Sequence, residues 1–114
     1  MTGEEFVLIA RDEGEIIGAV RLMKRGDTLT LRGMFIDEKY QRQGLGTKML
    51  GVLKREIGEE ECYCLSRTHL EDFYGFIGFK KIPFDSVPKN LKKRYDEVRK
   101  EYDVIAMKKD RGEV

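Results

Sequence analysis

The sequence predicts an α+β domain in which helices flank a central, mostly antiparallel mixed sheet. Over the first 36 residues, short apolar and β-branched runs alternate with turn residues, as in successive hairpins. Two later stretches repeat apolar residues at three- and four-residue spacing, which is the pattern of helices that bury one face. A glycine turn joins the two patterns, and strand-like segments resume after it.

The composition describes one globular domain over residues 1–114. Charged residues make up 38% of the chain and hydrophobic residues 40%, which excludes a disordered protein. The 22 basic and 21 acidic side chains nearly cancel, so we expect no nucleic-acid partner. No apolar run approaches the roughly 20 residues of a membrane span, and no signal peptide is evident. We therefore expect no membrane association and a cytoplasmic location.

Three strands are predicted before the glycine turn. They cover residues 6–10, 16–23 and 28–36, with turn residues at 12–14 and 25–27 between them. Two hairpin connections in a row make these strands antiparallel neighbours. Gly33 interrupts the third strand, which predicts a β-bulge or a close backbone approach. A weak spot in the strand is the alternative interpretation.

The turn after the third strand carries Gly44 and Gly46. Apolar residues at helical spacing over 45–57 place a helix directly after it, and Gly58 is expected to end that helix. A helix N-terminus presents unpaired N–H groups at the positive end of its dipole, and glycines let a phosphate approach them. Thr47 can add a hydroxyl donor. The spacing fits neither a P-loop nor a dinucleotide fingerprint, and a plain tight turn is the alternative.

The remainder of the chain is predicted to alternate between strand and helix. Residues 61–66 form a strand that a helical crossover makes parallel to the third strand. A helix over 70–77 stops at Gly78, and a strand over 79–84 follows. A second long helix starts at Ser86 and Pro88, with an apolar stripe that reaches Tyr102 and a charged face interpreted as solvated. A last strand covers 103–108, and residues 110–114 form a frayed tail.

Cys62 and Cys64 are expected on the same face of the strand over 61–66. Two cysteines and one histidine are poor material for a zinc site, so no metal is expected. The pair is interpreted as ordinary reduced thiols that act as small hydrophobic side chains.

Two motifs resemble those of the GCN5-related N-acetyltransferase (GNAT) superfamily. Gln41, Gly44 and Gly46 match its Q/R-x-x-G-x-G/A motif, and residues 73–79 (FYGFIGF) match its F-Y-x-x-x-G-F segment, about 30 residues later. The predicted order of elements over almost the whole chain is also similar to that fold. The resemblance implies an acyl-CoA N-acyltransferase fold with a V-shaped cleft, and acetyl-CoA as cosubstrate.

The resemblance also assigns roles to particular residues. The pyrophosphate of acetyl-CoA would be cradled by the turn, and its pantetheine arm would pair with the backbone of the third strand beyond Gly33. The coenzyme-binding residues are then Met34, Phe35, Ile36, Gln41, Arg42, Gln43, Gly44, Leu45, Gly46 and Thr47. Tyr74 matches the tyrosine that protonates the departing thiolate in many members. From periodicity alone, Tyr74 is a core aromatic residue on a helix.

The general base is not evident from the sequence. His69, the only histidine, precedes Tyr74 at a helix start, where the dipole favours the neutral imidazole that a base requires. It is our candidate, and Glu38, Glu71 and Asp72 are the alternatives. The chain also departs from the family pattern at Arg67, where many members have an asparagine that contacts the coenzyme.

The resemblance implies transfer of an acetyl group to a primary amine by direct attack in a ternary complex. The acceptor, a small molecule or a peptide, stays open. Most members begin with a strand and two helices that wall the acceptor site, whereas strand signals here start near residue 6. We therefore expect a short form whose wall comes from residues 88–101 or from a second subunit, and a homodimer. The alternatives are a non-catalytic coenzyme A sensor or interaction module, and a site for another phosphate ligand such as a nucleotide.

Overall fold

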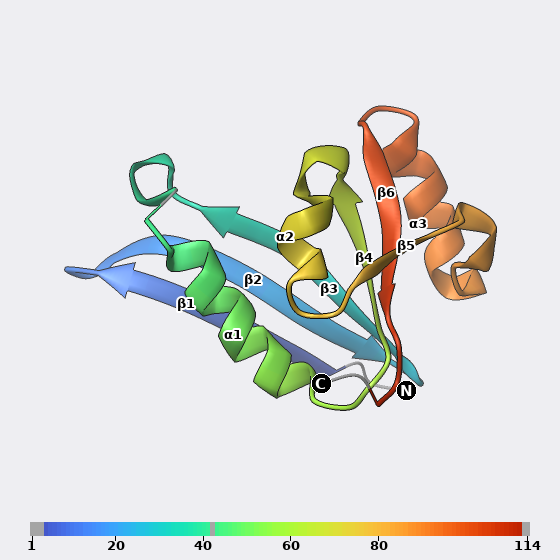
Figure 1. Ribbon diagram of the computed structural model, residues 1–114, viewed down its shortest axis with the longest axis horizontal. Coiled ribbons are helices and arrows are strands. Elements are labelled where there is room, and N and C mark those ends of the chain that lie inside the picture. Colours follow the sequence, from blue (N-terminus) through green and yellow to red (C-terminus); the bar gives the residue numbers. More distant parts are fainter. Residues whose placement is uncertain (1–3, 42, 113–114) are drawn as a thin grey trace.

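The computed structural model describes residues 4–41 and 43–112 (Figure 1). It contains one six-stranded sheet of order β1-β2-β3-β4-β6-β5, with helices against both faces. The strands are β1 (Glu4–Asp12), β2 (Glu15–Arg25), β3 (Thr28–Ile36), β4 (Cys62–Arg67), β5 (Lys80–Ile82) and β6 (Val104–Lys109). The helices are α1 (Leu45–Ile57), α2 (Glu71–Gly75) and α3 (Lys89–Arg99). Short 3₁₀ turns occupy Glu38–Tyr40, Thr68–Leu70 and Phe84–Ser86. The predicted mixed sheet with flanking helices is confirmed.

The first three strands form the predicted antiparallel meander. Their register breaks at one place on β3. Ala19 of β2 lies opposite Phe35, but Arg21 lies opposite Arg32, so Gly33 and Met34 together face a single residue. Gly33 has φ of +65°, a left-handed conformation that glycine adopts without strain. The β-bulge expected at Gly33 is therefore present.

The bulge marks the point at which β3 and β4 separate. The two strands run parallel, as predicted, and pair only from Leu29–Cys62 to Leu31–Cys64. Beyond Leu31, β3 keeps its pairing with β2, while β4 continues beside β6. The free ends of β3 and β4 diverge in Figure 1. The sheet thus opens into the expected V, with its apex beside Gly33.

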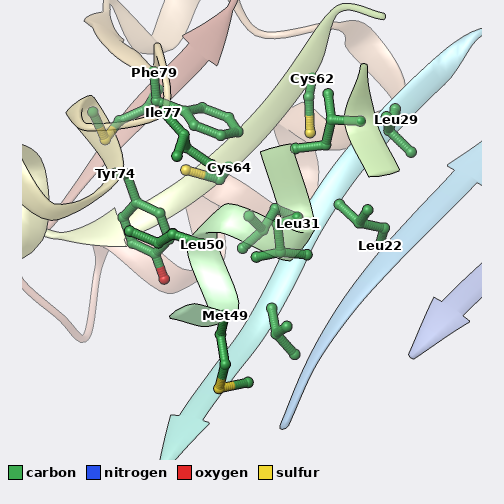
Figure 2. Packing of buried hydrophobic residues seen from close by; sticks show 14 of the residues in the cluster. Leu22, Leu29, Leu31, Met49, Leu50, Cys62, Cys64, Tyr74, Ile77 and Phe79 are labelled. Carbon is green, nitrogen blue, oxygen red and sulfur yellow. The ribbon is translucent and has the colours of Figure 1, made fainter. Parts of the chain in front are cut away.

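The two faces of the sheet bury different clusters. Helices α1 and α2 pack on one face, with Leu50, Leu53 and Tyr74 among the buried side chains; α3 packs on the other, through Tyr95. Strand alternation separates the clusters, because successive side chains point to opposite faces. Figure 2 shows part of the larger cluster, in which α1 and α2 converge on the β3–β4 pair.

Most strands differ from their expected bounds by one or two residues, and three other differences have a local cause. Helix α2 has five residues, because the chain tightens into turns with three-residue hydrogen bonds before Gly78, whose φ is +104°. Strand β5 stops at Ile82, since Pro83 offers no N–H to a sheet ladder. Helix α3 starts at Lys89 rather than at Ser86, because a residue that precedes a proline avoids helical geometry, and Val87 is extended.

Cys62 and Cys64 are free thiols on the core face, as expected. Burial raises the pKa of both, to about 12 for Cys62, so both stay protonated. Within the described part of the chain, no three metal-ligating side chains are grouped. In residues 4–41 and 43–112, no helix has the length and apolar character needed to cross a membrane. Residues 113–114 of the predicted tail lie outside the described residues, and β6 extends one residue beyond its expected end.

Candidate active site

The turn between β3 and α1 is braced by two glutamine side chains. Gln41 Nε2 donates a hydrogen bond to the carbonyl oxygen of Ile36 at 3.1 Å. Gln43 Nε2 donates to the carbonyl oxygen of Lys39 at 2.6 Å. The first bond ties the turn to the end of β3, and the second closes the 3₁₀ turn that follows the strand. Gly44 comes next in the chain; it is the N-cap of α1 and has φ of +83°.

The first turn of α1 presents backbone N–H groups that no side chain caps. Among the described residues, the amides of Leu45, Gly46 and Thr47 donate to no backbone carbonyl, whereas Lys48 N–H donates to the carbonyl of Gly44 at 3.1 Å. No acidic side chain stands in this turn. The open amides and the helix dipole together favour an anion, and phosphate in particular.

The two glycines of the turn have different roles. A Cβ at Gly46 would lie 3.0 Å from Ile36 Cδ1 and 3.0 Å from Phe73 Cε1, so glycine allows α1 to approach both β3 and α2. A Cβ at Gly44 would meet nothing within 4 Å. Gly44 therefore leaves open space in front of the free amides.

A cavity of about 490 Å³ opens beside these amides, within the usual size range of ligand sites. It is walled by the end of β3, the glycine turn, the 3₁₀ turn at Thr68–Leu70 and the start of α2. Its lining residues are Met34, Ile36, Gln41, Gly44, Gly46, Thr47, His69, Leu70 and Phe73. Six of the ten residues predicted to bind the coenzyme thus surround one cavity.

The other four residues predicted to bind the coenzyme are not among those that line the cavity. Phe35 is 50% exposed and occupies the opposite strand face from Met34 and Ile36, so only its backbone can reach the cavity. Gln43 braces the turn, and Leu45 packs against the core. Arg42 lies outside the described residues. Its predicted role in phosphate binding stays a prediction, as do the binding roles of the other nine.

The edge of β3 that faces β4 is unpaired beyond Leu31. Two residues of this stretch, Met34 and Ile36, line the cavity, and the carbonyl of Ile36 already accepts the hydrogen bond from Gln41. An open strand edge can pair with an extended ligand as though that ligand were another strand. The end of β3 therefore offers backbone partners to a long amide-bearing molecule.

Tyr74 lies in the core beside the cavity and does not line it. Its ring makes edge-to-face contacts with Phe73 and Phe79, at centroid distances of 5.2 and 6.2 Å. Figure 2 shows its hydroxyl pointing away from Ile77 and Phe79. Burial raises the pKa of Tyr74 above its ordinary value, so the phenol keeps its proton. In that state it is a proton donor.

His69 is exposed in the 3₁₀ turn before α2 and lines the cavity. The structure therefore brings it next to the predicted coenzyme site. The alternatives Glu38, Glu71 and Asp72 are exposed and are absent from the cavity wall. Of the candidate bases, His69 alone faces the cavity.

A second cavity of about 200 Å³ opens on the α3 face of the sheet, and the sequence did not predict it. It lies at the same β3–β4 separation, since Leu31, Arg32 and Gly33 form part of its wall. The rest of the wall consists of Thr30, Leu65, Arg67, Arg94, Tyr95, Val98, Tyr102 and Val104. Arg94 comes from the helix face interpreted as solvated; it is exposed, but it borders this cavity.

The sequence model of the family described as "Acetyltransferase (GNAT) domain" matches residues 1–93. Among solved structures, the chain is similar to N-acetylglutamate synthase from Neisseria gonorrhoeae, solved with coenzyme A and N-acetyl-glutamate. That match has 18% identity and a TM-score of 0.72, and it covers 90% of this chain and 25% of the synthase. No curated protein matches the chain in sequence.

Two further structures are similar over comparable parts of the chain. An acyl-CoA N-acyltransferase from Pseudomonas aeruginosa has 17% identity and a TM-score of 0.72, covering 96% of this chain and 70% of that one. The PaiA N-acetyltransferase from Thermoplasma acidophilum, in complex with coenzyme A, has 18% identity and a TM-score of 0.63. That match covers 93% of this chain and 60% of the PaiA chain. At these identities the likeness establishes the fold.

Proposed function

The chain belongs to the GNAT acetyltransferase family, and we propose that it transfers an acetyl group from acetyl-CoA to a primary amine within a ternary complex. The observation that carries this proposal is the cavity between β3, the glycine turn and α2. It combines uncapped helix amides with an open strand edge, as a ligand with a diphosphate and an extended amide arm requires.

The coenzyme would lie with its pyrophosphate on the amides of Leu45, Gly46 and Thr47. Its pantetheine arm would run along the open edge of β3 towards Gly33. That placement is supported by Gly44, which leaves the space before the amides free, and by the apolar Met34 and Ile36 on the wall. The thioester would then reach the apex of the V, where the two cavities approach each other.

The chemistry requires a neutral amine to attack the thioester carbonyl carbon. A C–N bond forms, the C–S bond breaks, and the products are an amide and free coenzyme A. A backbone N–H near Gly33 would stabilise the oxyanion, which is commonly the largest single contribution to such catalysis. Tyr74 would give its proton to the departing thiolate, because its raised pKa keeps the phenol protonated. His69 would accept the proton of the amine through water, since it is the candidate base that borders the cavity.

Release of free thiol from acetyl-CoA in the presence of primary amines tests the proposal. We expect thiol release that depends on both the amine and the protein. Acetyl-CoA binding without thiol release for any amine would favour the non-catalytic coenzyme A sensor. The absence of a carboxylate or imidazole from the lining of the α3-face cavity is compatible with that alternative. Displacement of acetyl-CoA by ATP at similar concentration would instead favour a nucleotide site.

We further propose that the protein acts as a homodimer. Ile9, Ala19 and Phe35 lie in one row across β1, β2 and β3, because Ile9 pairs with Ala19 and Ala19 with Phe35. This row is on the sheet face opposite α1, and Ile9 and Phe35 are 43% and 50% exposed. A second copy would bury this row, and association would follow from the apolar area removed from water. The cytoplasmic location stays a prediction, which cell fractionation would test.

Sedimentation equilibrium at micromolar concentration is expected to give twice the mass of the chain. Replacing Phe35 by lysine should give the mass of one chain, because it puts a charge in the row. The control is Phe76→Lys, since Phe76 is 69% exposed in the turn after α2 and lies outside the row. A monomeric intact protein would contradict the homodimer.

A further inference from the structure

We propose that the acceptor is a small primary amine that also carries an anionic group, either carboxylate or phosphate, and that Arg32, Arg67 and Arg94 bind this group in the α3-face cavity. The inference rests on the proposed function, because it names the substrate class of the same reaction. The overall net charge of +1 gives no sign of such a preference. It follows from where the fold gathers three arginines.

The α3-face cavity lies where an acceptor must approach. Gly33 belongs to its wall, and the next residue, Met34, belongs to the wall of the coenzyme cavity. Between the two cavities the sheet has no β3–β4 pairing beyond Leu31–Cys64. An amine held in the α3-face cavity therefore faces the apex of the V from the side opposite α1 and α2.

Three chain segments bring one arginine each to this cavity. Arg32 comes from β3, Arg67 from the end of β4 and Arg94 from α3. No aspartate or glutamate is among the residues that line it. Within the described part of the chain, none of the three arginines forms an ion pair. Their positive charge is thus uncompensated by the protein.

Arg32 is the least satisfied of the three. Its Nε is buried and has no hydrogen-bond partner among the described residues, and its Nη1 contacts only the thioether sulfur of Met23, at 3.1 Å. Burial and the nearby charges of Arg94, Arg21 and Arg25 lower its pKa. Arg32 is partly buried, and a guanidinium with a buried, unpaired N–H among like charges gains from pairing with an anion. A bound anionic group would supply that partner.

A second buried donor belongs to a residue of the same cavity wall. Tyr95 lines the cavity and is 2% exposed, and its hydroxyl is buried without a partner in the described structure. Arg67 is held in place by its position over the Tyr102 ring, at 5.1 Å from the centroid. The cavity thus offers guanidinium forks, which bind carboxylate and phosphate with two hydrogen bonds, together with a phenol.

The room available limits the size of the acceptor. The cavity measures about 200 Å³, below the roughly 300–1,000 Å³ common for ligand sites. A neighbouring hollow of about 280 Å³ shares Thr30, Arg32 and Arg94 and adds Arg25. Its lining also contains no acidic residue. These dimensions suit a molecule of amino-acid size, with its anionic end towards Arg32 and Arg94.

Acceptor competition tests the inference. Thiol release from acetyl-CoA is measured with glutamate and with O-phosphoserine, each against its neutral counterpart, glutamine or serine, and with spermidine as a cationic amine. We expect kcat/KM for at least one anionic amine to exceed that of its counterpart by about 10- to 100-fold, the range for a hydrogen bond to a charged group. The carboxylate and phosphate arms show which anion is preferred.

Variants separate binding of the anionic group from the chemistry. Arg32→Gln and Arg94→Gln should raise KM for the preferred anionic amine by about 10-fold each and leave acetyl-CoA affinity unchanged. The control is Arg55→Gln, because Arg55 is exposed on α1, outside both cavities, and should have no effect. Arg94→Glu should shift the preference towards spermidine.

Two failures can be told apart. Turnover of neutral or cationic amines at least as fast as of anionic ones would overturn this inference and leave the acetyltransferase proposal standing. Absence of acetyl-CoA binding, or of thiol release with every amine, would overturn the proposed function and this inference with it.

Discussion

Replacing Gly44 by valine is expected to weaken acetyl-CoA binding by roughly 100-fold. Gly44 has φ of +83°, and the space beside it is open, in front of the free amides of α1. A valine there would fill the space that the pyrophosphate needs. It would also force a β-branched residue into left-handed geometry, which costs about 1–2 kcal/mol of folding free energy. Titration calorimetry measures the affinity, and thermal unfolding measures the stability.

Gly26→Val is the matched control. Gly26 also has positive φ, +59°, and open space around it, but it lies in the β2–β3 hairpin away from both cavities. It should lose similar stability and keep its affinity for acetyl-CoA. Equal affinities for Gly44→Val and the unmodified protein would show that the turn is not the phosphate site.

Replacing Tyr74 by phenylalanine is expected to lower kcat by about 100-fold or more, with the affinity for acetyl-CoA retained. The change removes one hydroxyl and leaves the ring packed against Phe73 and Phe79. The thiolate must then leave without a proton donor. Steady-state kinetics and calorimetry on the same preparation separate the two quantities. Simultaneous loss of affinity and stability would instead give the Tyr74 hydroxyl a structural role only.

Tyr63→Phe is the control for Tyr74→Phe. Tyr63 is also buried, but it lies on the α3 face near the start of β4, and its hydroxyl donates to Glu61 at 3.3 Å. Its replacement should leave kcat unchanged.

The pH profile gives an independent check on Tyr74. Because burial raises the pKa of Tyr74 above its ordinary value of about 10, the phenol should remain a proton donor throughout the neutral and mildly alkaline range. The rate should rise with pH as the amine loses its proton. We expect no fall in rate below about pH 10. A descending limb near neutral pH would assign the acid to another group.

The sequence predicted best those structural features that depend on residues close together along the chain. Gly33, with the strand around it, predicted the bulge, because only a residue without a side chain takes that conformation freely. The spacing of Gln41, Gly44 and Gly46 predicted the turn and the helix after it, and the position of Tyr74 followed from a second motif. These features are local, and the structure contains them at the predicted places.

The α3-face cavity was not predictable in the same way. Its three arginines are far apart in the sequence. They line one cavity only because the strand order puts β6 beside β4, and α3 packs over that part of the sheet. On the helix alone, Arg94 belongs to a charged face like that of any solvated helix. The side of the sheet on which Arg32 lies depends on the bulge. Unbroken strand alternation would place Arg32 on the same face as Met34 and Ile36, but the extra residue at Gly33 moves Arg32 to the α3 face.

A crystal structure of the protein with coenzyme A would test the central claim most directly. We expect the pyrophosphate to accept hydrogen bonds from the amides of Leu45, Gly46 and Thr47, and the arm to run along β3. The sulfur should lie at the β3–β4 separation, within hydrogen-bond reach of the Tyr74 hydroxyl. Coenzyme bound elsewhere, or a sulfur that the Tyr74 hydroxyl does not face, would contradict the account.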